Sequence, residues 1–136
     1  MLFRSAVSPA AAWLDLMAFL ASAPCLMRLY GKVVLGGHNI PFDLGFLQRL
    51  HRLAGEKRPF SDFFSHRFVD TMAIGGFAQL CGAYSGKLGL SDLLSAFGLK
   101  NDAAHTALAD ARATAQLLEK FTNTTQFGIP TAREVA

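Results

Sequence analysis

The segment VVLGGHNIPFDLGFL, residues 33–47, decides how the rest of the chain is interpreted. Lys32 to Gly37 is a short β-branched run that ends in two glycines, which predicts a buried strand. From Phe42 to about Leu53 apolar residues return at helical spacing, so we expect a helix to follow the strand. In an α/β fold the groups that bind ligands lie at the carboxyl ends of the strands, where this segment places His38 and Asn39.

The remainder of the chain continues this alternation of helix and strand. We expect a helix from Pro9 to about Ala23 with Ser8 as N-cap, a second strand at Arg67–Val69 closed by Asp70, a compact helix at Ser91–Phe97 capped by Ser91, and a last helix from about Thr106 to Phe121. Helices that alternate with short buried strands predict an α/β fold.

The composition indicates one domain from a reducing compartment. The 136 residues suffice for a single core, and 51% of them are hydrophobic. The net charge of +3 tolerates a polyanionic partner without requiring one. Cys25 and Cys81 lie far apart and outside any CxxC pattern, so the sequence predicts neither a zinc site nor a disulfide framework.

The first 25 residues imitate a secretory signal, with a basic start, an apolar run and an Ala-x-Ala pattern. Two features oppose that interpretation. Asp15 interrupts the apolar run, and Ser8-Pro9 is a typical helix start. No apolar stretch approaches the roughly 20 residues that span a bilayer. We therefore expect a cytoplasmic protein, and secretion remains the alternative that rests on this segment alone.

Asp110 lies on the apolar side of the last predicted helix. At about 100° per residue, the arc that contains it also holds Ala107, Leu108, Ala111, Thr114, Ala115, Leu117, Leu118 and Phe121. A carboxylate on a buried face is costly unless a cation or strong donors meet it. The partner of Asp110 is therefore expected to be a metal ion, an Arg or Lys, or a backbone cap, and for an isolated acid a salt bridge is the commoner solution.

A second acid, Asp43, opens the helix that follows the first strand. Taken alone, Asp43 could favour the helix dipole, Asn39 could be a turn residue, and His38 could be a hydrogen-bonded core histidine. Two inward carboxylates with His105 just ahead of the last helix favour a different interpretation. Oxygen ligands with few nitrogen or sulfur partners suit Mg²⁺ or Mn²⁺, and a nearby histidine can deprotonate a water held by such ions.

These motifs resemble a known family. HNIPFD at 38–43 resembles the second exonuclease motif of the DEDDh 3′–5′ exonucleases, the DnaQ-like superfamily of proofreading exonucleases and ribonuclease T. HTALADARAT at 105–114 resembles that family's third motif, a His followed five residues later by Asp. Between them, RFVDTM and GLSDLLSAFGL are similar to the family's intervening strand and short helix, so the resemblance covers roughly residues 10 to 121.

The resemblance implies a role for each candidate residue. Asp43 and Asp110 would bind two Mg²⁺ or Mn²⁺ ions, and His105 would be the general base that activates the attacking water. Asn39 would help to position the residues of the site or would bind the terminal nucleotide. Phe42 would support a stacked base, although core packing is the commoner task for a phenylalanine.

One further acid has no place in the family pattern. Asp70 follows a strand but matches no metal position of the family, so we expect it to cap a helix.

The chain departs from the family pattern at its N-terminus. No Asp-x-Glu occurs among the 136 residues, although the family's first motif supplies two metal ligands in that form. We expect a truncated RNase H-like fold at 1–121 that lacks the first three strands and keeps short parallel strands flanked by helices, followed by a polar tail at 122–136. Such a fold would expose a sheet edge, which a second copy or a partner chain would cover.

Two functions follow from the resemblance. The first is a 3′–5′ exonuclease domain that hydrolyses phosphodiester bonds at DNA or RNA 3′ ends, incomplete or weakly active in this form. The alternative is a non-catalytic remnant that binds nucleic acid or a polymerase-type partner protein.

Overall fold

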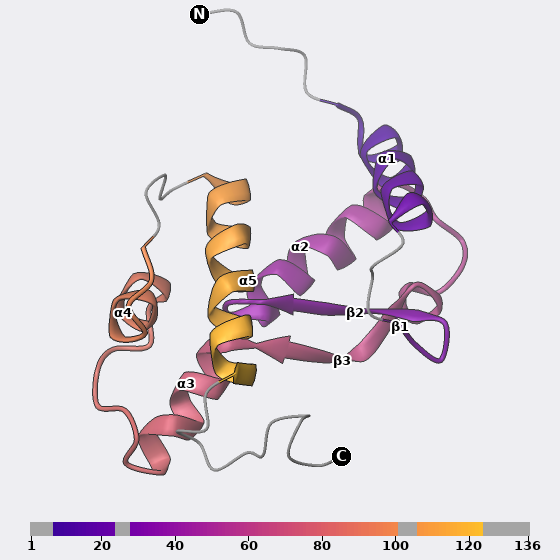
Figure 1. Ribbon diagram of the computed structural model, residues 1–136. Coiled ribbons are helices and arrows are strands. Elements are labelled where there is room, and N and C mark those ends of the chain that lie inside the picture. The colour runs from indigo at the N-terminus through magenta and orange to yellow at the C-terminus, as the bar shows by residue number, and fades with distance from the viewer. Residues whose placement is uncertain (1–6, 24–27, 101–105, 124–136) are drawn as a thin grey trace, which may run out of the picture. The chain divides into compact units, whose positions relative to one another are not determined.

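The computed structural model describes residues 7–23, 28–100 and 106–123 (Figure 1). They form two compact units. The first unit runs to Leu35 and resumes at Ile40–Val69, and the second comprises Gly36–Asn39 and the chain from Asp70 onward. Along the chain the elements are α1 (Pro9–Ser22), β1 (Arg28–Leu29), β2 (Lys32–Gly37), α2 (Ile40–Leu53), a 3₁₀ turn (Phe60–Asp62), β3 (Phe64–Asp70), α3 (Thr71–Leu80), α4 (Leu90–Ala96) and α5 (Ala107–Asn123).

Helix α1 begins as its sequence predicts. The Ser8 side chain accepts a hydrogen bond from the Ala11 N–H at 3.2 Å, and Pro9 occupies the first helical position. Trp13 is buried, and the half-buried Leu16, Met17 and Leu20 pack against the same core. These four residues recur at spacings of three and four, as expected for a helix that packs one face inward.

The sheet contains two parallel strands and one short antiparallel strand. Its order is β1-β2-β3, and Figure 1 shows the β2 and β3 arrows pointing in the same direction. In the first unit the Val33 N–H donates to the Phe63 carbonyl at 2.9 Å, at the start of this pairing. Strand β1 pairs with β2 in antiparallel register, Arg28 opposite Val33, and two residues are too short to leave a sequence pattern. The expected mixture of helices with short parallel strands is confirmed.

Helix α2 turns a different face inward from the one its phenylalanines suggest. Ile40 is buried, and Leu50 packs against the core formed by Trp13 and Val33. Phe42 and Phe46 instead remain 64% and 60% exposed. Core packing, the commoner task of a phenylalanine, is therefore not what Phe42 does; Ile40 is buried and Leu47 and Leu50 are half-buried instead.

Trp13 contacts and stabilises the loop that follows α2. Its indole N–H donates to Glu56 at 3.4 Å, and its ring meets those of His51 and Phe63 edge-on. His51 Nε2 donates to the Arg58 carbonyl at 2.8 Å, and the Arg58 guanidinium lies 4.4 Å above the Phe63 ring. Hydrogen bonds from the Arg58 N–H and from Trp13 lower the pKa of Glu56 from its ordinary value.

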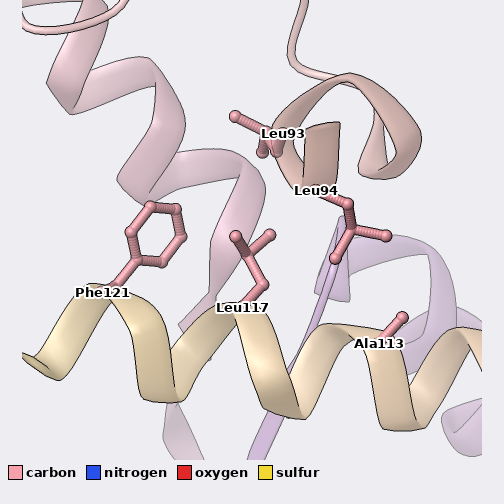
Figure 2. Close-up of a cluster of buried hydrophobic side chains, with 5 residues drawn as sticks. All are labelled: Leu93, Leu94, Ala113, Leu117 and Phe121. Atoms are coloured by element: carbon pink, nitrogen blue, oxygen red, sulfur yellow. The ribbon is translucent and has the colours of Figure 1, made fainter. Parts of the chain in front are cut away.

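The second unit has its own core, drawn in Figure 2. Leu93 and Leu94 of α4 face Leu117 and Phe121 of α5, with Ala113 beside them. The edge of the Phe97 ring meets the Phe121 ring at a centroid distance of 4.9 Å. Helix α5 contacts both α3 and α4, and its buried residues are Ala113, Thr114, Leu117 and Phe121.

Two details of the second unit differ from the expectation. Helix α4 begins at Leu90 and has Gly89 rather than Ser91 at its N-cap position, although Gly98 follows its end with a positive φ of 70° as a C-terminal glycine does. In α5, Ala107, Leu108, Ala111 and Ala115 are exposed and Ala113 is buried, so the buried arc is narrower than the expected one and includes a residue outside it.

No helix among the described residues combines the length and the apolar character needed to cross a membrane. The polar tail expected at 122–136 falls outside the described residues except for Thr122 and Asn123, which end α5.

Candidate functional site

The second unit gathers four polar residues where strands β2 and β3 end. His38 and Asn39 follow β2, while Asp70 ends β3 and Thr71 begins α3. His38 Nδ1 lies 2.9 Å from the Thr71 hydroxyl oxygen, and the Asn39 N–H donates to Asp70 Oδ1 at 2.9 Å. Asp70 and Thr71 are buried. Two side chains therefore tie the end of one parallel strand to the end of its neighbour.

Asp70 is the acceptor at the centre of this cluster. Its Oδ1 also accepts the Met72 N–H at 2.9 Å, which makes Asp70 the N-cap of α3 as the sequence predicted. The same oxygen fixes the backbone of Asn39, which adopts a left-handed conformation with φ of 62°. Asparagine tolerates this conformation better than most residues, and the turn reverses the chain between β2 and α2.

The hydrogen bonds of Thr71 assign the proton on His38. The Thr71 hydroxyl donates to the Gly37 carbonyl at 3.3 Å, and a hydroxyl has one proton to donate. His38 Nδ1 must then donate to Thr71, which leaves Nε2 unprotonated in the neutral ring. Burial lowers the pKa of His38 from its ordinary value of 6.5, and the Asp70 carboxylate raises it by a smaller amount. His38 is thus held as a neutral, hydrogen-bonded histidine.

In the first unit, Phe42 and Asp43 lie in the first turn of α2. The Asp43 side chain is exposed, so the expectation that it points inward is wrong. Its position near the helix N-terminus stabilises the negative charge without burial. The exposed Phe42 ring lies 5.0 Å from the Phe46 ring, centroid to centroid. An exposed carboxylate beside an exposed aromatic ring is chemically able to bind a cation and an adjacent base.

In the second unit, Asp110 lies in the first turn of α5. Thr106 starts this helix: its carbonyl accepts the Asp110 N–H at 2.9 Å, and its hydroxyl accepts the Ala109 N–H at 3.3 Å. Asp110 is half-buried at the N-terminal end of the helix face that contains the buried Thr114 and Leu117. The inward tilt predicted for Asp110 is therefore present, and the side chain remains within reach of solvent.

The predicted site residues are divided between the two units. Asp43 and Phe42 belong to the first unit, Asn39 and Asp110 to the second, and His105 lies outside the described residues. The two carboxylates are oxygen donors of the kind that Mg²⁺ and Mn²⁺ prefer. Within the described ranges, no group of three His, Cys, Asp or Glu side chains is arranged to hold a metal ion. The donor chemistry fits a divalent ion, but the described residues supply fewer ligands than a closed site needs.

Fold and site together define the class of protein. It is an α/β protein whose polar groups gather at the carboxyl ends of neighbouring parallel strands, where such folds bind their ligands. A family model described as "Exonuclease", of the RNase T type, matches residues 15–118, more than half of the chain. The chain therefore belongs to this exonuclease family, and its α/β architecture is that of a partial RNase H-like exonuclease fold. No solved structure matches the chain.

One member of the strand-end cluster was missed from the sequence. Thr71 is fully buried and joins His38 to Gly37, yet a threonine after an aspartate at a strand end has many interpretations. The signal that could have identified it is the pair of strands itself. Two parallel strands that end together bring the residues after each strand into contact.

Proposed function

We propose that the chain is a domain of a divalent-metal-dependent 3′–5′ exonuclease that acts on nucleic-acid 3′ ends. The observation that carries the proposal is that Asp43, His105 and Asp110 all fall within the residues matched by the exonuclease family model. They stand in the two motifs, HNIPFD and HTALADARAT, that resemble the family's metal and base motifs.

Each residue then has a task. Asp43 and Asp110 hold Mg²⁺ or Mn²⁺ through their carboxylates, and His105 takes the proton of the attacking water. The bound ions supply positive charge beside the scissile phosphate. Asn39 holds the turn that leads into α2, and Phe42 offers its exposed ring to the terminal base.

The proposal includes a low activity for these 136 residues. They contain no Asp-x-Glu, so two of the acids expected in the family's metal site are not among them. Residues that act as a unit lose most of their effect when part of the unit is absent. The second candidate is a non-catalytic module that binds nucleic acid or a polymerase-type protein. The cytoplasmic location stays a prediction.

The direct test is Mn²⁺-dependent release of nucleotides from the 3′ end of a labelled single-stranded oligonucleotide, DNA and RNA in parallel. We expect slow release by the wild type and none by Asp43→Asn, Asp110→Asn or His105→Ala. Asp62→Asn, an exposed carboxylate in the 3₁₀ turn, is the matched control and should release nucleotides at the wild-type rate.

The possible results separate the two functions. Equal release by all variants would reveal a contaminating nuclease and overturn the assignment. Binding of oligonucleotide without release, unchanged when a segment carrying Asp-x-Glu is supplied, would establish the non-catalytic module instead. Restored release on adding that segment would support the enzyme.

A further inference from the structure

Helix α2 carries an exposed apolar stripe that its packing does not explain. At about 100° per residue, four of its residues fall within an arc of about 60°. These are Phe42, Phe46, Arg49 and Leu53, and we call them the α2 stripe. The two rings and Leu53 are all at least 60% exposed, whereas Ile40, on the other side of the helix, is buried and Leu50, about 70° from the centre of the stripe, is half-buried. Large exposed apolar side chains in a row mark a binding surface more often than a folding need.

The two exposed rings are not stacked on each other. Their centroids lie 5.0 Å apart and their planes are tilted by 58°, so the rings do not lie face to face. Residues four apart on a helix are displaced by about 6 Å along its axis. The stripe therefore offers two separate aromatic faces rather than one stacked pair.

The charge on the stripe is positive. Arg49 lies between the rings and Leu53, and its side chain is exposed. Arg52, one helical turn from the stripe's centre, is exposed as well. Among the described residues the ion pair found joins Arg58 to Glu56, in the loop after α2. Aromatic faces next to arginine suit a ligand that combines flat rings with negative charge.

A second copy of the chain fits this surface poorly. In a symmetric dimer the same patch meets itself, so two stripes placed face to face would bring the two Arg49 side chains together. A single strand of nucleic acid has no such conflict, because its bases stack on the rings while its phosphates pair with the arginine.

We propose that the α2 stripe is a track for single-stranded nucleic acid, with Phe46 stacking on a base upstream of the one on Phe42 and Arg49 pairing with a phosphate. The track extends the proposed substrate contact at Phe42 along the helix, and its role in catalysis rests on the proposed function. Phe46 and Arg49 are binding residues in this proposal and touch no reacting atom.

The test measures binding with hydrolysis prevented. A 5′-fluorescein-labelled oligothymidylate of about ten nucleotides, and its oligouridylate counterpart, are titrated with the full chain in EDTA and followed by fluorescence anisotropy. Phe46→Leu keeps apolar bulk and removes the aromatic face, so we expect affinity to fall by about fivefold or more. Phe46→Tyr keeps the face and should bind as the wild type does.

The contribution of Arg49 is tested by the salt dependence of binding. Removing one phosphate contact reduces the slope of log affinity against log salt by about 0.7 for a single strand. We expect that change for Arg49→Gln and no change for Arg67→Gln, an exposed arginine on β3. Phe19→Leu on α1, whose ring is 61% exposed, is the matched aromatic control and should leave affinity unchanged.

Several outcomes would overturn the track. Wild-type affinity of Phe46→Leu would do so, as would equal losses in Phe46→Leu and Phe19→Leu. Light scattering that shows a wild-type dimer broken by Phe46→Leu, with affinity unchanged, would identify the stripe as an interface between copies. If nucleotide release still depends on Asp43 and Asp110 in any of these cases, the proposed function stands and the track alone fails.

Discussion

Replacing Asp70 with alanine should destabilise the strand-end cluster by a predictable amount. One carboxylate oxygen accepts both the Asn39 N–H and the Met72 N–H, each at 2.9 Å. Loss of the N-cap of α3 costs about 1 kcal/mol. Leaving the part-buried Asn39 N–H without this acceptor costs about 1 kcal/mol more. The free energy of unfolding should therefore fall by about 2 kcal/mol, a sum of these two losses.

The Asp70→Asn variant distinguishes the loss of the hydrogen bonds from the loss of side-chain volume. Asp70→Asn keeps an oxygen where the two N–H groups point, so we expect it to cost less than about 1 kcal/mol. Asp62→Ala, which removes an exposed carboxylate from the 3₁₀ turn, should cost about 0.5 kcal/mol or less. Urea titrations give the free energies, and a fall in the midpoint at constant slope identifies a change in stability.

Amide hydrogen exchange identifies which hydrogen bonds are lost in each variant. The amides of Asn39 and Met72 should exchange faster in Asp70→Ala and stay protected in Asp70→Asn. If Asp70→Ala were as stable as the wild type, or if the Asn39 amide kept its protection, Asp70 would not be what holds the two strand ends together.

Three further predictions concern the core and the site. Leu117→Ala, at a fully buried position, should lower the free energy of unfolding measured in urea by about 2–5 kcal/mol. Leu108→Ala on the same helix, at a position that is 61% exposed, should lower it by about 0.5 kcal/mol or less. Equal losses would contradict the core assigned to α5. A Cβ at Gly75 would lie 2.9 Å from a fully buried leucine of α4, so Gly75→Ala should lower the melting temperature. A Cβ at Gly76 would have no contact under 3.7 Å, so Gly76→Ala should preserve or raise the melting temperature. The reverse order would refute this packing. Burial lowers the pKa of His38 below 6.5, so just below that pH the unfolded chain binds more protons than the folded chain, and the free energy of unfolding should fall as the pH drops through about 6.5. His38→Gln should remove this part of the pH dependence of the urea midpoint. An unchanged pH profile would exclude His38 as its source.

The fold could be predicted where sequence pattern and burial agree. Ser8-Pro9 started α1 because capping is local, and the run from Lys32 to Gly37 formed β2 because a β-branched segment between breakers has few alternatives. The two-residue β1 had no pattern to detect. The exposure of Phe42 and Phe46 could not be predicted, because helical spacing identifies an apolar stripe but not whether the rest of the chain covers it.

The two motifs of the candidate site could be recognised in the sequence, whereas the residues around them could not. HNIPFD and HTALADARAT fall within the residues matched by the exonuclease family model, and the roles proposed for Asp43, His105 and Asp110 stay predictions. The link from His38 to Thr71 spans 33 positions in the sequence, and no local rule connects residues that far apart. It became visible only once the strands β2 and β3 were seen to end together.

The central proposal is that Asp43 and Asp110 each bind a divalent ion. The most direct measurement is Mn²⁺ titration of the ¹⁵N-labelled chain, because a bound paramagnetic ion broadens the amide signals around it. We expect the signals around both aspartates to broaden, and we expect Asp43→Asn to abolish the broadening around residue 43 and Asp110→Asn that around residue 110. Broadening around either aspartate that persists when that aspartate itself is replaced would contradict the proposal.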